Sequence, residues 1–238
     1  MPTRLPSLQR PPIAFAHRGA RAHAPDNTVE AFQLALRLGA TGLESDVWLS
    51  ADGHAILDHD GVVGSRLRKV PIGRLDRGDV PAHMPSLADL YDACGTDFHL
   101  SLDVKDPAAI DAVVAVATEV GDAARDRLWI CHPDLALLTT WRARWPDLQL
   151  VHSTRLDRLP RGPELHGAEL AELGIQAVNL HYREWTGGTV ALYHRFDRLA
   201  FAWDLQFERV LSEALDSGID AIYSDHVDLM MTAVRAIA

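Results

Sequence analysis

The sequence predicts an α/β protein folded as a (β/α)8 TIM barrel with an added β-hairpin arm after strand 2. Three observations predict this fold. Eight short apolar segments alternate with helical segments along 238 residues, as in barrels of parallel strands. An Asp52-Gly53 turn between two apolar runs indicates one hairpin. No glycine-rich dinucleotide fingerprint follows a predicted strand, which disfavours the alternative, a doubly wound open sheet.

The predicted elements follow one another in a regular order. Barrel strands are expected at 13–17, 42–49, 98–105, 128–131, 148–152, 177–180, 199–203 and 221–224. Helices are expected at 29–38, 86–94, 108–120, 135–145, 164–173, 189–196, 207–217 and from 227 onward. Ser86 and Asp89 have the spacing of a capping box, which supports the start of the second helix.

Composition limits the class of protein. A formal net charge of -10 argues against a nucleic-acid partner, because phosphate backbones are bound by basic surfaces. Cys94 and Cys131 fit no metal-ligand spacing and are too few for a disulfide scaffold, so a reducing compartment is expected. No run reaches transmembrane length, and no signal-peptide pattern opens the chain. We therefore expect one cytoplasmic barrel domain over residues 1–238, with 1–12 as a lead-in and no stable membrane insertion. The sequence does not indicate the oligomeric state.

The hairpin arm brings distant residues together. Folding the chain back about Asp52-Gly53 sets Val47 near Leu57 and carries His59 beside Glu44. On the outgoing strand, Glu44 and Asp46 are two residues apart and therefore point to one face. Two carboxylates on one face, flanked by imidazole, indicate a divalent cation.

The segment 61–85 is expected to be irregular and basic. It carries Arg66, Arg68, Lys69, Arg74 and Arg77. We favour a solvated loop over the alternative, a basic flap that covers an anionic substrate.

The C-terminal ends of all eight strands meet at one face of a barrel, where catalytic residues gather. The residues expected there are His17, Glu44, Asp46, Asp103, Lys105 and Trp203, with His59 supplied by the arm. Three carboxylates without cysteine favour Mg²⁺ or Ca²⁺ over zinc. Arg18 and Lys105 can neutralise a phosphate, and two imidazoles can act as general acid and general base.

These motifs resemble the glycerophosphodiester phosphodiesterase family. The resemblance rests on His17-Arg18-Gly19, Pro25-Asp26-Asn27-Thr28, Glu44-Ser45-Asp46-Val47, Asp52-Gly53 and His59-Asp60, in that order. It extends to Pro85-Ser86-Leu87, Asp103-Val104-Lys105 and the closing run 219–225.

The resemblance implies hydrolysis of a small-molecule glycerophosphodiester to sn-glycerol 3-phosphate and an alcohol, with a divalent cation. It implies that His17 and His59 are catalytic and that the metal ligands are Glu44, Asp46 and Asp103. It further implies that Arg18 and Lys105 contact the phosphate and that Trp203 lines the substrate pocket. The chain departs from the usual pattern at Asp103, where the family has Glu, and in the run 204–206. Which histidine is the acid, and whether water or a glycerol hydroxyl attacks, is left open.

Plainer interpretations stand beside these. His132, His152 and His181 also end predicted strands, but structural roles compete evenly with substrate contact. Asp58 and Asp60 are expected to orient the arm or His59. The predicted packing residues are Trp129, Trp141, Trp145 and Trp185, and Asp225 is expected to cap the last helix or to support the site.

Three other functions remain open. One is a phosphodiesterase of the phospholipase type, either lysophospholipase D-like or cyclic-phosphate-forming, acting on lipids. The second is a metal-dependent sugar isomerase or aldolase. The third is a non-catalytic barrel that binds phosphodiesters.

Overall fold

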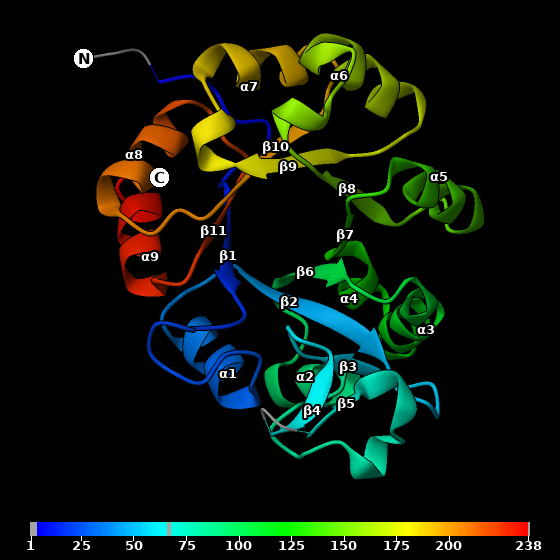
Figure 1. Cartoon of the computed structure of the whole chain (residues 1–238). Coiled ribbons are helices and arrows are strands. Elements are labelled where there is room, and N and C mark those ends of the chain that lie inside the picture. The colour runs from blue at the N-terminus through cyan, green and yellow to red at the C-terminus, as the bar shows by residue number, and fades with distance from the viewer. Residues whose placement is uncertain (1–3, 66–67, 238) are drawn as a thin grey trace.

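The computed structural model describes residues 4–65 and 68–237 and shows a closed barrel of eight parallel strands. The strand order around the barrel is β1-β2-β6-β7-β8-β9-β10-β11, and β11 pairs again with β1. In Figure 1 the helices form an outer ring, and the blue strand β1 lies beside the orange strand β11. The predicted (β/α)8 barrel with its extra hairpin arm is confirmed.

The barrel elements lie within two residues of their predicted bounds. The strands are β1 Ile13–His17, β2 Gly42–Leu49, β6 His99–Val104, β7 Leu128–His132, β8 Gln149–Ser153, β9 Ala177–His181, β10 Leu199–Trp203 and β11 Ala221–Ser224. The helices are α1 Val29–Arg37, α2 Leu87–Cys94, α3 Ile110–Val120, α5 Leu135–Arg144, α6 Gly162–Glu172, α7 Gly187–His194, α8 Glu208–Asp216 and α9 Val227–Arg235. The short helix α4, Asp122–Asp126, was not predicted.

The arm folds back as its turn predicts. Strand β3, Ala55–Leu57, pairs antiparallel with β2, and Val47 lies opposite Leu57. The amide of Asp58 donates to the carbonyl of Asp46 over 3.1 Å, so the chain that follows the arm stays at the mouth of the barrel.

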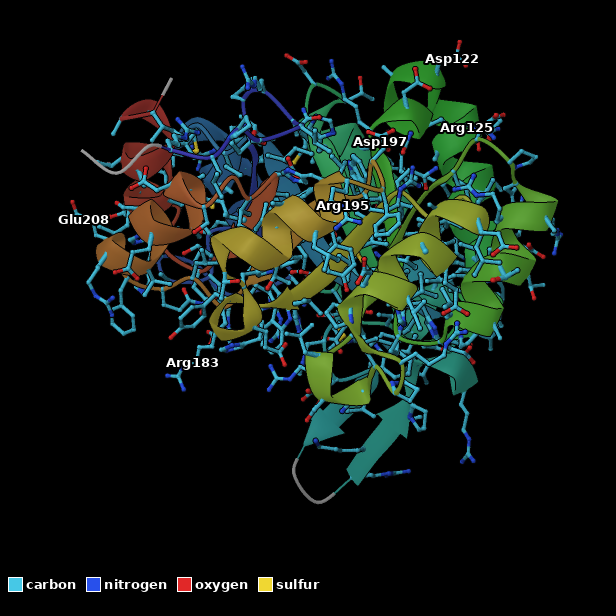
Figure 2. The ribbon with its side chains drawn as sticks, turned by 90° about the horizontal axis from the view of Figure 1, so that it is seen from above. Asp122, Arg125, Arg183, Arg195, Asp197 and Glu208 are labelled. Carbon is cyan, nitrogen blue, oxygen red and sulfur yellow. The ribbon has the colours of Figure 1, made fainter. Side chains whose placement is uncertain are left out.

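The prediction of an irregular segment over 61–85 is wrong in part. Strands β4, Val62–Ser65, and β5, Arg68–Pro71, form a second hairpin, which projects beyond the barrel in Figure 2. Val63 pairs with Val70 across it, and the buried Ile72 anchors its base. Short 3₁₀ turns follow at Ile72–Arg74 and Arg77–Asp79. Pairing of β-branched residues such as Val63 and Val70, and no recognised turn motif, indicates this hairpin, which makes it hard to predict from local sequence.

The basic side chains of this segment do not line the pocket at the barrel mouth, within the described residues. Arg68, Lys69 and Arg74 are exposed, and Arg77 forms an ion pair with Asp89 at 2.9 Å. Arg66 lies outside the described residues. These positions favour the solvated interpretation over the flap.

Two packed layers hold the barrel together. Between strands and helices lies a continuous apolar layer in which Leu43 and Val47 are fully buried. Inside the barrel, large aromatic side chains pack below the mouth. The ring of Phe15 stacks on that of Tyr223 with 4.7 Å between ring centroids, and Trp129 and Phe201 pack edge to face with 5.1 Å between ring centroids. This aromatic layer fills the barrel below the mouth. In the described part of the chain, no helix is long and apolar enough to cross a membrane.

Candidate active site

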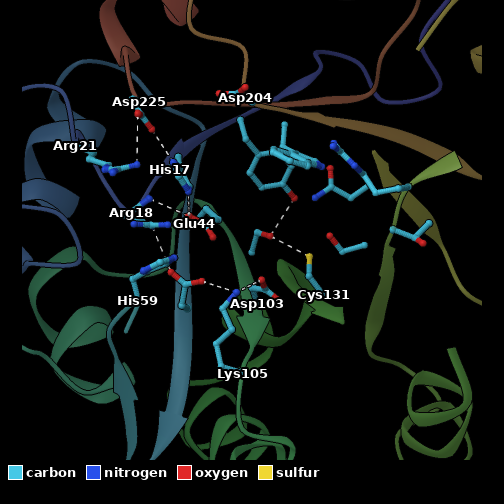
Figure 3. A pocket seen from close by; sticks show the side chains of 18 of the residues that line it. His17, Arg18, Arg21, Glu44, His59, Asp103, Lys105, Cys131, Asp204 and Asp225 are labelled. Atoms are coloured by element: carbon cyan, nitrogen blue, oxygen red, sulfur yellow. Dashed lines mark hydrogen bonds and ion pairs between the residues drawn. The ribbon is translucent and has the colours of Figure 1, made fainter. Parts of the chain in front are cut away.

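A pocket of about 570 Å³ opens at the C-terminal ends of the strands. All eight predicted site residues line it: His17, Arg18, Glu44, Asp46, His59, Asp103, Lys105 and Trp203. This size suits a small organic ligand. Figure 3 shows the acidic, basic and imidazole groups of one side of this pocket facing one another.

The turn after β1 is built for close packing. Gly19 has a φ of +79°, and a Cβ there would lie 2.7–2.9 Å from the backbone and Cβ of Ala31. Arg18 also has a positive φ, 53°, which is uncommon for a non-glycine residue and marks a turn held by its surroundings. Its backbone N–H donates to Oε2 of Glu44 over 2.9 Å. The His17-Arg18-Gly19 motif thus ties the first strand end to the second.

Strand register places the charged side chains in two rows. His17 on β1 lies level with Glu44 on β2, and Asp46 on β2 lies level with Asp103 on β6. Glu44 and Asp46 are both buried. Lys105 bridges the second row, with Nζ 3.0 Å from Oδ1 of Asp46 and 2.5 Å from Oδ2 of Asp103.

Burial and charge set the protonation of the first row. Burial raises the pKa of Glu44, and the charges of Asp46 and Asp103 add to that rise, while His17 opposes it. Burial lowers the pKa of His17, but the charge of Glu44 and a hydrogen bond to Asp225 outweigh it, so the pKa is raised overall. Nε2 of His17 lies 3.8 Å from Oε2 of Glu44. The pair therefore holds a proton at neutral pH more readily than an isolated histidine does.

Asp225, at the end of β11, orients His17. Its Oδ1 lies 2.6 Å from Nδ1 of His17, as drawn in Figure 3, while Arg21 forms an ion pair with Oδ2 at 3.5 Å. Because a carboxylate accepts, Nδ1 carries the donated hydrogen, and Nε2 is the nitrogen that faces the pocket. The sequence left open whether Asp225 caps the last helix or supports the site; its carboxylate here bonds the predicted catalytic histidine.

The arm supplies the second imidazole. His59 lines the pocket, and its Nδ1 lies 2.8 Å from Oδ1 of Asp60. Oδ2 of Asp58 accepts from the backbone N–H groups of Asp60 and Gly61 at 2.9 and 2.7 Å. Asp58 thus fixes the turn and Asp60 contacts the ring, as the adjacent positions of these residues in the sequence suggested.

The three predicted metal ligands fit a hard cation in chemistry and burial. Oδ2 of Asp46 is buried, makes an ion pair with Nε of Arg18 at 3.4 Å and has no hydrogen-bond partner among the described residues, so it can still accept a cation. Over residues 4–65 and 68–237, however, no three acidic, histidine or cysteine side chains already converge as a metal site. The ammonium of Lys105 lies between Asp46 and Asp103 instead.

A neutral hydrogen-bonded cluster forms the floor of the pocket. The hydroxyl of Ser101 lies 3.0 Å from that of Tyr223 and 3.3 Å from Sγ of Cys131. Burial raises the pKa of both Tyr223 and Cys131, so these groups stay protonated. Sequence reasoning missed them as pocket residues, although Ser101 shares the inward face of its strand with Asp103.

The far side of the pocket is built by Trp203 and by residues after β8 and on β9. The guanidinium carbon of Arg155 lies 5.2 Å from the centroid of the Trp203 ring, and the His181 ring packs edge-on against it. Asn179 on β9 is 7% exposed and also lines the pocket. No motif marked Arg155 or Asn179 in the sequence.

Residues with plainer predicted roles lie outside the pocket lining. His132 accepts a hydrogen bond from the backbone N–H of Asp134, and His152 lies in a buried chain with His166 behind β8. The predicted packing tryptophans Trp129 and Trp141 are buried, and Trp145 and Trp185 pack partly buried against the core.

Barrel and mouth together define a class: a TIM-barrel protein with clustered carboxylates, imidazoles and fixed cations at its strand ends. Residues 17–90 match the model of the Glycerophosphoryl diester phosphodiesterase family. A glycerophosphodiester phosphodiesterase of Caldanaerobacter subterraneus subsp. tengcongensis is 29% identical over 109 residues, which are 39% of this chain and 45% of that protein. Residues 17–90 are therefore similar to the glycerophosphoryl diester phosphodiesterase family.

Solved structures agree in fold. Glycerophosphodiester phosphodiesterase from Thermotoga maritima matches with a TM-score of 0.79 at 22% identity, over 92% of this chain and 97% of that chain. An Oleispira antarctica phosphodiesterase in complex with the product sn-glycerol-3-phosphate matches with a TM-score of 0.80 at 21% identity, over 94% and 97%. By sequence, the chain aligns with less than half the length of the Caldanaerobacter relative.

Proposed function

We propose that this protein hydrolyses glycerophosphodiesters to sn-glycerol 3-phosphate and an alcohol with the help of Mg²⁺ or Ca²⁺. The observation that carries the proposal is one pocket in which two imidazoles, three carboxylates and two fixed cations meet. The match of residues 17–90 to the family model supports the same reaction. The product held by the Oleispira antarctica phosphodiesterase supports sn-glycerol 3-phosphate as the product here.

The cation would be held by Glu44, Asp46 and Asp103. When bound, it would supply positive charge for a phosphate oxygen as negative charge builds up there. The buried Oδ2 of Asp46 supports this assignment, because it makes no hydrogen bond among the described residues and only an ion pair with Arg18. Asp103 is shorter than the Glu that is usual at its position, so it suits a ligand that reaches the ion through water.

Arg18 and Lys105 bind the phosphate. Nε of Arg18 is buried without a hydrogen-bond partner among the described residues and lies 3.4 Å from Oδ2 of Asp46. Lys105 is half-buried, and Asp103 and Asp46 raise its pKa against the effect of burial, so it stays charged. Two fixed positive charges stabilise the pentacoordinate transition state more than the diester, because negative charge increases on reaching it.

His17 is the general acid and His59 is the general base. Asp225 and Glu44 favour the protonated form of His17, and Nε2 is left free to deliver its proton to the departing alkoxide. His59 is bonded through Nδ1 to Asp60, which leaves Nε2 to accept a proton from the attacking hydroxyl. That hydroxyl belongs to water or to the neighbouring position of the glycerol, and a cyclic phosphate trapped in a single turnover would identify the second route.

The test is the release of glycerol 3-phosphate from glycerophosphoethanolamine, measured with Mg²⁺, with Ca²⁺ and with EDTA. We expect metal-dependent release by the wild type and His132→Ala, and at least about a hundredfold less by His17→Ala. No release with either metal would overturn the enzyme assignment in favour of a binding barrel.

A second substrate separates the two imidazoles. p-Nitrophenolate leaves without a proton, so His17→Ala should impair bis(p-nitrophenyl) phosphate hydrolysis far less than glycerophosphoethanolamine hydrolysis. His59→Ala should impair both alike. The reverse pattern would exchange the two roles.

We also place this protein in the cytoplasm as one domain. The thiols of Cys94 and Cys131 are free, and a reducing compartment keeps thiols in that state. Fractionation of the source cells would test the location.

A further inference from the structure

We propose that the half of the mouth opposite His17 is a subsite for a leaving alcohol that carries its own oxyanion, with Arg155 as the specificity-determining residue. The oxyanion is a carboxylate or a phosphoryl group on the alcohol. This inference rests on the proposed function and adds the class of alcohol to it.

The barrel order places this subsite. Three strands separate β8 from β1 in either direction around the barrel, so Arg155, just after β8, lies across the mouth from His17. Asn179 on β9 and Trp203 on β10 lie on the same side as Arg155, and all three line the pocket. A diester whose phosphate sits between His17 and Lys105 can therefore extend one of its two alcohols toward Arg155.

The guanidinium of Arg155 lies over Trp203 and forms one long ion pair, with Glu184. Its carbon lies over Trp203 at 5.2 Å, and its Nη1 is buried with no hydrogen-bond partner in the described part of the chain. In that ion pair Oε1 of Glu184 lies 3.9 Å from Nε and also accepts the backbone N–H of Leu156 at 3.2 Å. Oε2 of Glu184 is buried without a hydrogen-bond partner among the described residues. Glu184 does not line the pocket. A buried donor without a partner is costly, so an oxyanion at Nη1 would be stabilised.

The other polar groups on this side leave little for a cationic alcohol to bind. Asp204 is already engaged through Oδ2 with His181 at 3.1 Å and through Oδ1 with Gln206 at 3.4 Å. Arg158, which is exposed, adds another guanidinium to the lining on this side. The acceptor still open is Oδ1 of Asn179, which is buried and unpartnered among the described residues and suits a hydroxyl or an ammonium hydrogen.

Trp203 is not free to bind a quaternary ammonium group. Such groups bind to the open faces of aromatic rings, but a guanidinium already lies over this ring and a histidine edge packs against it. A choline group would meet like charge at Arg155. The subsite therefore favours an anionic alcohol over a purely cationic one.

Two matched substrate pairs test the subsite. Glycerophosphoserine and glycerophosphoethanolamine differ only by a carboxylate, and phosphorylated and plain glycerophosphoinositol differ only by a phosphate. We expect kcat/KM to favour the anionic member of at least one pair by about tenfold, the effect of one charge-assisted hydrogen bond. The pair that shows the preference identifies the oxyanion.

Variants of Arg155 locate the preference. Arg155→Gln should reduce the ratio of kcat/KM within the pair by about tenfold, and Arg155→Lys, which keeps the charge but not the planar fork, should retain part of it. Arg161→Gln, an exposed arginine outside the pocket lining, should leave the ratio unchanged. Thermal unfolding of each variant checks that it is folded, and because the readout is a ratio, a general loss of active protein cancels.

The outcomes are distinct. If all four diesters are hydrolysed at equal kcat/KM, or if Arg155→Gln leaves the ratio unchanged, the subsite is wrong and the proposed function stands. If none is hydrolysed, the proposed function fails and the subsite fails with it.

Discussion

The two halves of the barrel mouth differ in how their charges are satisfied. On the side of β1, β2 and β6, carboxylates, imidazole and cations contact one another closely, as in the bridge from Lys105 to Asp46 and Asp103. On the side of β8, β9 and β10, Nη1 of Arg155 and Oδ1 of Asn179 are buried without hydrogen-bond partners among the described residues. The two such atoms on the first side, Nε of Arg18 and Oδ2 of Asp46, lie 3.4 Å apart as an ion pair. In our proposal the first half acts on the phosphodiester group, which all substrates share. The second half has polar groups available to bind the leaving alcohol, which differs between substrates.

The largest effect is expected from the imidazoles of the first half. His17→Ala or His59→Ala should lower kcat by about a hundredfold or more, because each removes a proton-transfer group. Steady-state hydrolysis of glycerophosphoethanolamine measures this. His132→Ala, at the end of a strand but outside the pocket lining, is the control. Near-normal activity in either variant would remove that histidine from the reaction.

A smaller effect is expected from Asp225. Asp225→Asn keeps the shape of the side chain but removes the charge that helps to raise the pKa of His17. We expect kcat to fall about tenfold and the loss of activity on the alkaline side to begin at lower pH, since the acid form of His17 is lost earlier. The pH dependence of kcat measures both changes.

Asp228→Asn is the matched control for this variant, because Asp228 pairs with the half-exposed His23 at 3.2 Å and does not line the pocket. A pH profile of Asp225→Asn that coincides with the wild type would show that Asp225 does not tune His17.

The smallest effect concerns the scaffold behind the second half. His152 on β8 lies 2.8 Å from His166 on α6, and His166 lies 2.8 Å from the hydroxyl of Tyr193. If Nε2 of His152 donates to the carbonyl of Pro133, its Nδ1 accepts from Nε2 of His166, and Nδ1 of His166 accepts from the hydroxyl of Tyr193. With these donors and acceptors both imidazole rings are neutral. Burial and, to a smaller extent, the charge of the neighbouring His152 together lower the pKa of His166 from 6.5 to about 4.

Protons therefore bind the unfolded chain in preference to the folded one below about pH 6.5. The free energy of unfolding should be unaffected by His166 above that pH and should fall by about 1 kcal/mol between pH 7.5 and 5.5. Urea unfolding at both values measures the loss, which should shrink in His166→Gln and persist in the exposed control His83→Gln. An equal loss in both variants would contradict this assignment.

The sequence predicted the first half of the mouth far better than the second. His17-Arg18-Gly19 and Glu44-Ser45-Asp46 are local motifs, and alternation along β2 places both of its acids on the inward face. The turn at Asp52-Gly53 sets the register that keeps the arm at the mouth. Each of these signals lies within a few residues of the group that it positions.

The remaining contacts depend on closure of the barrel. Asp225 is 208 positions from His17. Only the count of eight barrel strands, and no local pattern, indicates that β11 pairs with β1. Arg155 follows β8 in a polar connection that resembles any solvated loop. The hairpin β4–β5 was missed because its signal is the pairing of Val63 with Val70 and not a recognised turn motif. That residues 1–238 form one domain stays a prediction.

The position of Lys105 has a consequence for the order in which ligands arrive. The pocket contains an ammonium group between two of its acids, so the charges of these three groups largely compensate one another. A divalent cation held by Asp46 and Asp103 would have to compete with that ammonium group. A displaced ammonium group would in turn be free to contact the phosphate of the diester.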